Sequence, residues 1–163
     1  MRIKPSAAPA RAPWQAIMVA FLGSFACIAV LVALTQVHQT LWIMAPFGAT
    51  CVLAFALPES PLAQPRHIIG GHVITALIGL LMLHSFGEAL WSTALAVALG
   101  IIAMQILRVT HPPAGANPLL IFSLHASWSF LIHPVLIGSV MIVLITYFCH
   151  RLAGQKKYPV YWW

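Results

Sequence analysis

The chain has 163 residues, of which 61% are hydrophobic and 6% are charged, whereas a soluble domain carries about a quarter charged residues. This balance excludes a water-soluble fold and leaves room for a single membrane domain. The formal net charge of +6 does not indicate a nucleic-acid partner, because the basic residues flank apolar stretches, as they do beside membrane spans.

Four uninterrupted apolar stretches follow one another along the chain, and each is long enough to cross a bilayer as a helix. The first, residues 17–34, follows a basic tail that carries Arg2, Lys4 and Arg11. It is too long for the apolar region of an ordinary signal peptide, so we expect an uncleaved first span. The other three stretches are residues 68–86, 89–109 and 130–149.

Two further apolar segments, residues 41–57 and 112–129, are interrupted by prolines and glycines. Each could therefore cross the membrane as a broken helix or re-enter it as a loop. If both cross, the outer loops hold Glu88 and no Lys or Arg. The basic residues after the first span then share the side of the N-terminus, and these are Arg66, Arg108, Arg151, Lys156 and Lys157. The positive-inside rule therefore favours six crossings.

This topology divides the chain into a cytoplasmic tail (1–15), a transmembrane domain (16–152) and a second cytoplasmic tail (153–163). We expect a multi-pass protein of a bacterial-type inner (plasma) membrane, with both termini in the cytoplasm. Single cysteines at positions 27, 51 and 149 lie in apolar surroundings with no C-x-x-C spacing. We interpret them as small buried hydrophobic residues.

The two interrupted segments resemble each other in sequence. Residues 46–55 align with residues 113–122 without a gap, matching Pro, Gly, Ala, Leu and Phe, and the same register places Gly71 opposite Gly138. Each half of the domain, about 16–87 and about 88–152, would then contain three crossings. Because three is odd, the second half must be inverted relative to the first. The predicted fold is therefore all-α, with about six transmembrane segments in two inverted repeats, the middle segment of each broken at Pro and Gly.

Both interrupted segments contain a Pro-x-Gly-Ala element, which is typical of a helix start. The first backbone N–H groups of a helix have no partner within it, and the helix dipole is positive there, so this end favours an anion. The sequence thus predicts an anion site at two convergent helix starts. Thr50 and Asn117 occupy equivalent positions and could add a donor; alternatively, they cap helix ends or bond neighbouring helices. The backbone groups assigned to the site belong to Gly48, Ala49, Gly115 and Ala116.

The run His111-Pro112-Pro113-Ala114-Gly115-Ala116 resembles the HPP family of integral membrane proteins. Residues 45–79, with Pro46-Phe47-Gly48-Ala49 and later Gly70-Gly71-His72, are also similar to that family. Members are associated with nitrite transport in cyanobacteria and chloroplasts, and the resemblance implies such a function here. Family members are often described as having four spans, whereas the charge distribution favours six.

Arg108 lies just before His111, where a guanidinium could bind or attract a small oxyanion; alternatively, it anchors a helix end at the cytoplasmic surface. His72 and His111 are candidates for proton coupling, or else ordinary histidines hydrogen-bonded between helices. The eight histidines show no H-x-x-x-H or H-E-x-x-H spacing, and Glu59 and Glu88 are the only acidic residues. We therefore expect no enzyme, no metal and no cofactor.

The predicted function is transport of a small inorganic anion, with nitrite as the best single candidate. An anion channel is the nearest alternative, and a non-transporting membrane subunit that assembles with a partner is an alternative of another class. A homodimer would help so small a transporter to embed its site in the bilayer.

Overall fold

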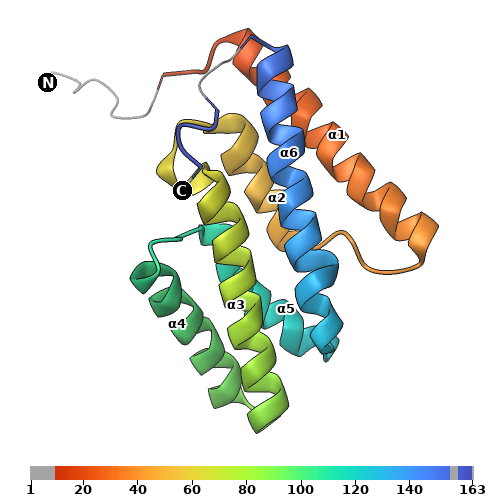
Figure 1. Ribbon diagram of the computed structural model, residues 1–163, viewed down its shortest axis with the longest axis vertical. Coiled ribbons are helices and arrows are strands. Elements are labelled where there is room, and N and C mark those ends of the chain that lie inside the picture. Colours follow the sequence, from red (N-terminus) through yellow and green to blue (C-terminus); the bar gives the residue numbers. More distant parts are fainter. Residues whose placement is uncertain (1–9, 155–157, 163) are drawn as a thin grey trace, which may run out of the picture.

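The computed structural model describes residues 10–154 and 158–162, and in this part of the chain all regular structure is helical. Four longer α-helices form the frame (Figure 1). They are α1 (Trp14–His38), α3 (Pro65–Phe86), α4 (Leu90–Ile106) and α6 (Ile137–Leu152). Arg2, Lys4, Lys156 and Lys157 of the predicted tails lie outside the described residues.

The shorter helices lie in the two interrupted segments and in the connections. α2 (Ala45–Cys51) continues into the π-helical turn η1 (Val52–Ala56), and the 3₁₀ turn η3 (Pro112–Ala116) continues into α5 (Asn117–Leu124). A non-helical connection separates each composite helix from the long helix before it, residues 39–44 in the first case and 107–111 in the second. The remaining short turns are η2 (Pro61–Ala63), η4 (Trp128–Leu131) and η5 (Ile132–Leu136).

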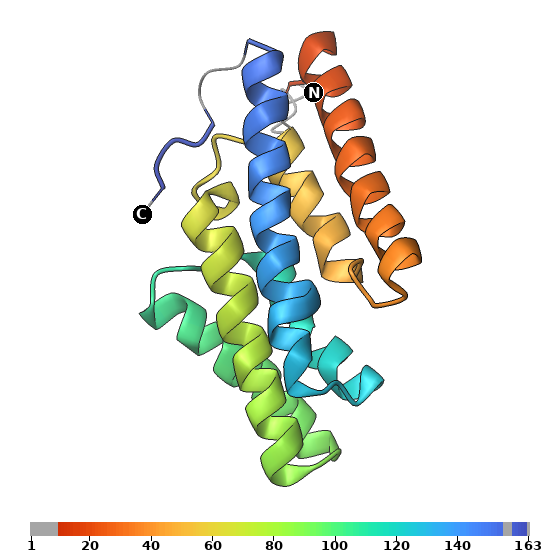
Figure 2. The ribbon, with the colours of Figure 1, turned by 45° about the vertical axis from the view of Figure 1, so that its right-hand side comes forward.

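Helices α3 and α6 run through the middle of the molecule in opposite directions (Figures 1 and 2). Helix α1 packs on α6 and on η1, whereas α4 and α5 pack on α3. Helices α2 and α5 also run in opposite directions, and each begins near the middle of the molecule. The arrangement brings the starts of the two interrupted helices to the same central region.

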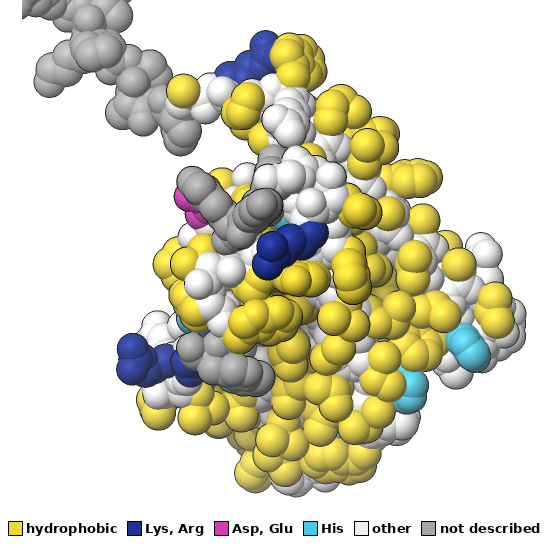
Figure 3. All heavy atoms as spheres, turned by 45° about the horizontal axis from the view of Figure 1, so that its top comes forward, with side chains coloured by type: hydrophobic (Ala, Val, Ile, Leu, Met, Phe, Trp, Pro, Cys, Tyr) yellow, Lys and Arg dark blue, Asp and Glu magenta, His cyan; other side chains and the backbone are white. Residues whose placement is uncertain are grey.

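The arginines of the described part lie at or beside the ends of the long helices. Figure 3, in which the top of Figure 1 comes forward, shows arginine side chains separated by hydrophobic ones. Two hydrogen bonds join these helix ends in pairs. Gln15 Nε2 of α1 donates to Ala153 O after α6 (3.2 Å), and Arg66 Nη2 of α3 donates to Leu107 O after α4 (3.4 Å). Glu88 follows the other end of α3, a helix of 22 residues that has Arg66 in its first turn. The arginines concerned are Arg11, Arg66, Arg108 and Arg151.

Three helical stretches are long and apolar enough to cross a membrane, namely Trp14–His38, Pro65–Phe86 and Trp128–Leu152. Two shorter apolar helices, Ala45–Ala56 and Leu90–Ile106, lie between them. The helical membrane architecture predicted from the sequence is therefore confirmed. The fourth helix ends at Ile106, three residues before the apolar stretch does, because Arg108 adopts a positive φ of 57°. The last stretch is not one regular helix, since η4 and η5 precede α6.

Close helix packing depends on small residues at the crossings of the central helices. An added Cβ on Gly71 of α3 would lie 2.7 Å from His111 Cβ and 3.0 Å from the backbone oxygen of Val109. An added Cβ on Gly138 of α6 would lie 2.5 Å from the ring of Phe47. Each glycine therefore lets an interrupted segment approach a central helix more closely than any side chain permits.

Candidate functional site

Four polar side chains from four segments meet in the middle of the bundle. Thr50 comes from α2, His72 from α3, His111 precedes η3, and Asn117 begins α5. All four residues have no exposed surface. Because polar groups inside a membrane protein are costly unless they are hydrogen-bonded, this cluster needs a complete account of its bonds. We call these four residues the central cluster.

The local sequence builds the two helix starts in the same way. Met44 and His111 are the N-cap residues of α2 and η3, and both have extended backbones, with φ of −141° and −136°. Proline follows in the first turn of each helix, where its missing N–H costs nothing. The third residue of each turn donates its N–H to the carbonyl of the N-cap residue, at 2.9 Å for Phe47 and 3.0 Å for Ala114.

The Thr50 hydroxyl is the hub of the central cluster. Its Oγ1 lies 2.8 Å from His72 Nε2 and 2.9 Å from His111 Nε2. The carbonyl of Pro46, one helical turn earlier, lies 3.1 Å from the same oxygen. A hydroxyl has one hydrogen to donate and two lone pairs to accept with, so its partners are constrained by the protonation of the two imidazoles.

The tautomer of His111 follows from its other nitrogen. His111 Nδ1 lies 2.8 Å from the carbonyl oxygen of Leu62, which only accepts, so Nδ1 carries the hydrogen. In the neutral ring Nε2 then accepts a hydrogen bond from the Thr50 hydroxyl. Thr50 must in turn accept from His72 Nε2, which fixes that ring as the Nε2–H tautomer.

Asn117 completes the chain on the far side of His72. Its Nδ2 lies 3.1 Å from His72 Nδ1 and 3.0 Å from the His72 carbonyl oxygen. It also lies 3.1 Å from Thr75 Oγ1, whose own hydrogen is donated to the carbonyl of Gly71 (2.8 Å). The amide has two hydrogens for these three acceptors, and its Oδ1 lies farther from His72 Nδ1, at 3.4 Å. The unprotonated Nδ1 of His72 therefore accepts from Asn117, as the tautomer derived from Thr50 requires.

The central cluster is closed and contains no carboxylate. The ring of Phe47 lies edge-on to His72 at 5.1 Å, and the two imidazole rings are 5.0 Å apart. Glu59 is exposed in the connection before α3, and Glu88 is bound to His125 at 2.7 Å near the opposite end. In the part of the chain that the structure describes, no group of three His, Cys, Asp or Glu side chains could hold a metal ion.

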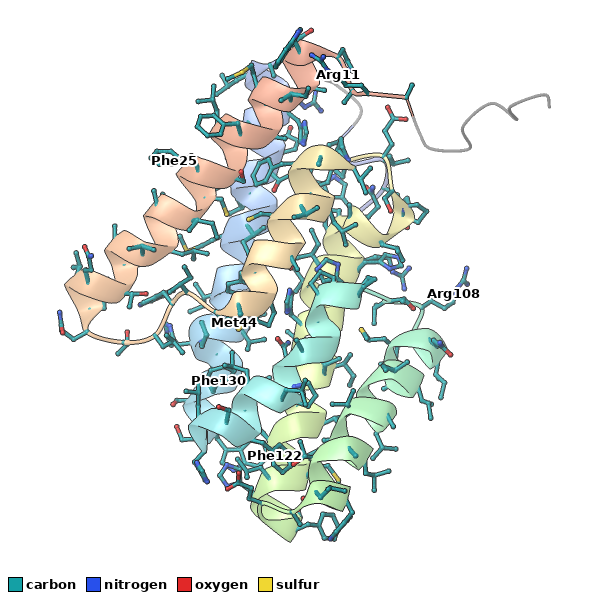
Figure 4. All side chains as sticks on the ribbon, turned by 180° about the vertical axis from the view of Figure 1, so that it is seen from behind. Arg11, Phe25, Met44, Arg108, Phe122 and Phe130 are labelled. Carbon is teal, nitrogen blue, oxygen red and sulfur yellow. The ribbon has the colours of Figure 1, made fainter. Side chains whose placement is uncertain are left out.

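The structure thus brings together four of the residues predicted from the sequence, namely Thr50, His72, His111 and Asn117. The side chains of the other predicted residues do not belong to this cluster. Arg108 is exposed, and its side chain points away from the molecule in Figure 4. Met44, the residue before α2, lies nearer the middle of the same view. Side-chain positions at the helix starts face outward, since Gly48, Ala49 and Ala116 are exposed and Gly115 is half-buried.

Two participants were missed by sequence reasoning. Thr75 lies three residues after His72 and therefore on the same face of α3, a spacing that could have indicated its role. The Leu62 carbonyl contributes backbone alone, and no sequence pattern marks it. Its position depends on Gln64, which is fully buried and donates from Nε2 to the carbonyls of Pro58 (2.9 Å) and Ser60 (2.8 Å).

Comparisons with known proteins agree on the class of membrane protein. Residues 9–159 match the family described as HPP, transmembrane region. Two transmembrane proteins of Dictyostelium discoideum are similar to the chain, one at 34% identity over 95% of this chain and another at 33% over 88%. The chain spans about half the length of these relatives, 54% in each case. No solved structure matches it.

Proposed function

The chain belongs to the HPP transmembrane family, and we propose that it transports a small inorganic anion, with nitrite as the first candidate. One observation carries the proposal: two proline-started helices that run in opposite directions meet at a buried cluster of hydrogen-bond donors. Broken helices that converge on a polar site inside the membrane are typical of secondary transporters. The choice of nitrite rests on the family resemblance, whereas the size and charge of the ligand follow from the donors.

The proposed site consists of the side chains of the central cluster rather than the backbone at Gly48 and Gly115. Thr50 and Asn117 lie on opposite nitrogens of His72, so their separation is about one imidazole ring. In the described conformation these groups bond one another, which corresponds to a closed transporter. An anion would bind when the cluster opens, taking over the hydrogens that Thr50 and Asn117 now donate within it.

We also propose that the two halves are inverted repeats. Equivalent positions are 67 residues apart in the sequence alignment, and one pair of equivalent contacts and one pair of equivalent N-cap residues support the proposal. Gly71 packs against Ala114, and its equivalent Gly138 packs against Phe47, the equivalent of Ala114. The two N-cap residues, Met44 and His111, are equivalent in the same register. Six crossings follow from this proposal, with the non-helical connections completing the two broken ones.

The proposed orientation places both termini in the cytoplasm of a plasma membrane. Arg66 lies in the first turn of α3 and bonds Leu107 O beside Arg108, whereas Glu88 follows the opposite end of α3, a distribution that the positive-inside rule favours. The exposed residue Pro61 tests this orientation. In a Pro61→Cys variant lacking the natural cysteines, an impermeant maleimide should label that position only after cells are opened, whereas labelling of intact cells would reverse the orientation.

Uptake of nitrite into vesicles containing the purified protein tests the proposed function. The wild-type protein should show saturable nitrite uptake. Nitrate and formate are added as competitors, and the anion that inhibits most strongly is the one that the site prefers. Thr50→Val should lower uptake about tenfold, the effect of one hydrogen bond to a charged ligand. Thr146→Val is the matched control, because Thr146 is also fully buried and its Oγ1 donates one turn back to Ile142 O (2.7 Å).

Three outcomes would overturn the proposal in different ways. Flux that does not saturate would indicate a channel. Equal losses in Thr50→Val and Thr146→Val would mean that both hydroxyls serve helix packing alone. No uptake or binding of any small anion, with one stoichiometric partner in the purified complex, would assign the chain to a non-transporting subunit.

A further inference from the structure

We propose that the anion crosses together with one proton, which moves along Asn117, His72, Thr50 and His111, and that neither can cross without the other. This inference rests on the proposed function and specifies its driving force. Two observations carry it. The hydrogen bonds of the central cluster form a continuous chain with one direction, and no carboxylate lies beside this chain in the described part of the protein.

The direction of the chain follows from its two ends. At one end His111 Nδ1–H donates to Leu62 O (2.8 Å), and at the other Asn117 Nδ2 donates to His72 Nδ1 (3.1 Å). Between them every hydrogen bond points the same way, from His72 Nε2 to Thr50 and from Thr50 to His111 Nε2. Groups that both donate and accept in one direction can pass a proton by shifting hydrogens along the existing bonds.

The transfer balances without any further reactant than a proton from water. When Asn117 moves aside, the proton forms an N–H bond at His72 Nδ1. The Nε2–H bond of His72 breaks as an O–H bond forms on Thr50, and the original hydroxyl hydrogen of Thr50 forms an N–H bond at His111 Nε2. His72 is again neutral as the other tautomer, and His111 is an imidazolium. The reverse sequence returns the cluster to its starting state. After release from His111 on the opposite side, His72 is still the Nδ1–H tautomer, so it must lose that hydrogen and regain one at Nε2 before the next cycle.

Among the residues that the structure describes, no carboxylate contacts His111 to balance the charge produced there. The titratable groups nearest to it are His72 and His67, and His67 is held by Thr110 O through Nδ1 (2.8 Å) and by the Tyr161 hydroxyl through Nε2 (3.1 Å). None of these groups supplies a negative charge at neutral pH. Glu59 is an exposed surface residue, and Glu88 is bound to His125.

Obligatory coupling follows from the cost of burying a lone charge. A proton alone would leave an unpaired imidazolium inside the membrane, and an anion alone would leave an unpaired negative charge among neutral donors; both are strongly unfavourable. An anion beside the imidazolium makes a neutral, charge-assisted pair. The loaded cluster is therefore neutral overall, so transport should carry no net charge.

The test measures protons and anions together in vesicles of the purified protein. An internal pH dye reports proton entry while nitrite uptake is assayed, and valinomycin with potassium sets the membrane potential. Protein-free vesicles measured in parallel give the passage of nitrous acid through lipid. We expect about one proton for each anion, acceleration by an inward proton gradient, and no response to a potential of about 100 mV, because the loaded cluster is neutral.

Variants separate a relay from a structural role. His72→Gln keeps hydrogen-bonding groups on both sides but cannot titrate, so proton entry per anion should fall about tenfold and any remaining uptake should respond to potential. Thr50→Ser should preserve the coupling ratio. His84→Gln is the matched control on the same helix, because His84 Nε2 donates to Ala126 O (3.1 Å) near the far end of α3, away from the central cluster.

Failure of this inference is distinguishable from failure of the proposed function. Saturable anion uptake that moves charge and carries no protons would overturn the coupling and leave anion transport standing. An unchanged proton ratio in monodisperse His72→Gln protein would overturn the relay. No anion uptake by wild type would overturn the proposed function and the coupling with it.

Discussion

The starts of α2 and η3 have nearly the same backbone and very different chemistry. Both have an extended N-cap residue, proline in the first turn, and a tight bond from the third N–H back to the N-cap carbonyl. The N-cap side chain is Met44 in one and His111 in the other. Met44 belongs to the hydrophobic core, whereas His111 bonds both Thr50 and Leu62 O.

This difference separates what shapes the site from what acts in it. Proline and glycine positions recur in both halves because both halves need a broken helix that packs closely on a central one. The titratable groups do not recur: the positions equivalent to His72 and His111 hold Ser139 and Met44. In the proposed account, a symmetrical frame carries a one-sided relay, and substitutions at frame positions should affect folding while substitutions at relay positions should affect transport.

The largest effect is expected at the frame position Gly71. In Gly71→Ala the new methyl group would lie 2.7 Å from His111 Cβ and 3.0 Å from a backbone oxygen, neither of which can move freely. Such overpacking should cost about 3 kcal/mol. Thermal unfolding in detergent should show a large fall in Tm. Gly115→Ala is the control, since nothing lies within 4 Å of its added Cβ and its Tm should hardly change.

The substitution His111→Met gives both helix starts the same N-cap residue. It should strongly reduce transport, with a smaller loss of stability than Gly71→Ala. His111→Met removes the last member of the relay and leaves Leu62 O without its donor, at a cost of about 1 to 3 kcal/mol. Nitrite uptake should fall at least about tenfold. If the variant retained wild-type uptake and coupling, the difference between the two N-cap residues would have no functional meaning. Met44→Leu should leave uptake near the wild-type level.

The equivalent of Asn117 in the first half is Thr50, and the substitution Asn117→Thr should have an intermediate effect on transport. Asn117→Thr is too short to reach both the His72 carbonyl and Thr75 Oγ1, so one or two hydrogen bonds of about 1 kcal/mol each are lost. The affinity for nitrite should fall a few-fold, measured as the half-saturating concentration in vesicles. A tighter half-saturation would contradict a role for the amide as donor.

The smallest effect is expected at the surface residue Arg108. Its backbone has a φ of 57°, a conformation that glycine adopts without strain. Arg108→Gly should therefore raise stability by about 0.5 kcal/mol, and uptake should change by less than about twofold because an exposed charge is screened by salt. A tenfold loss of uptake at physiological salt would instead support the direct contact predicted from the sequence.

Sequence reasoning found the residues of the cluster but not the faces they share. The alignment of residues 46–55 with 113–122 drew attention to Thr50 and Asn117, which both contact His72, and the HPP motif pointed to His111. Helix start signals alone cannot tell which side of a short helix faces inward. The predicted role of the backbone at Gly48 and Gly115 stays a prediction, and the space beside both Cβ positions is open. Arg108 is close to His111 in sequence, but an extended stretch of three residues spans about 10 Å. Contacts made by backbone alone, as at Leu62, leave no sequence signal.

The most direct test of the account is whether nitrite binds at the central cluster. Protein labelled with ¹⁵N-histidine has eight imidazole signal sets, and those of His72 and His111 are identified by their loss in His72→Gln and His111→Met. We expect nitrite to shift these two with one saturable midpoint, while His84 and His125 stay unchanged. Nitrite uptake by the same protein without any shift at His72 or His111 would contradict the central claim.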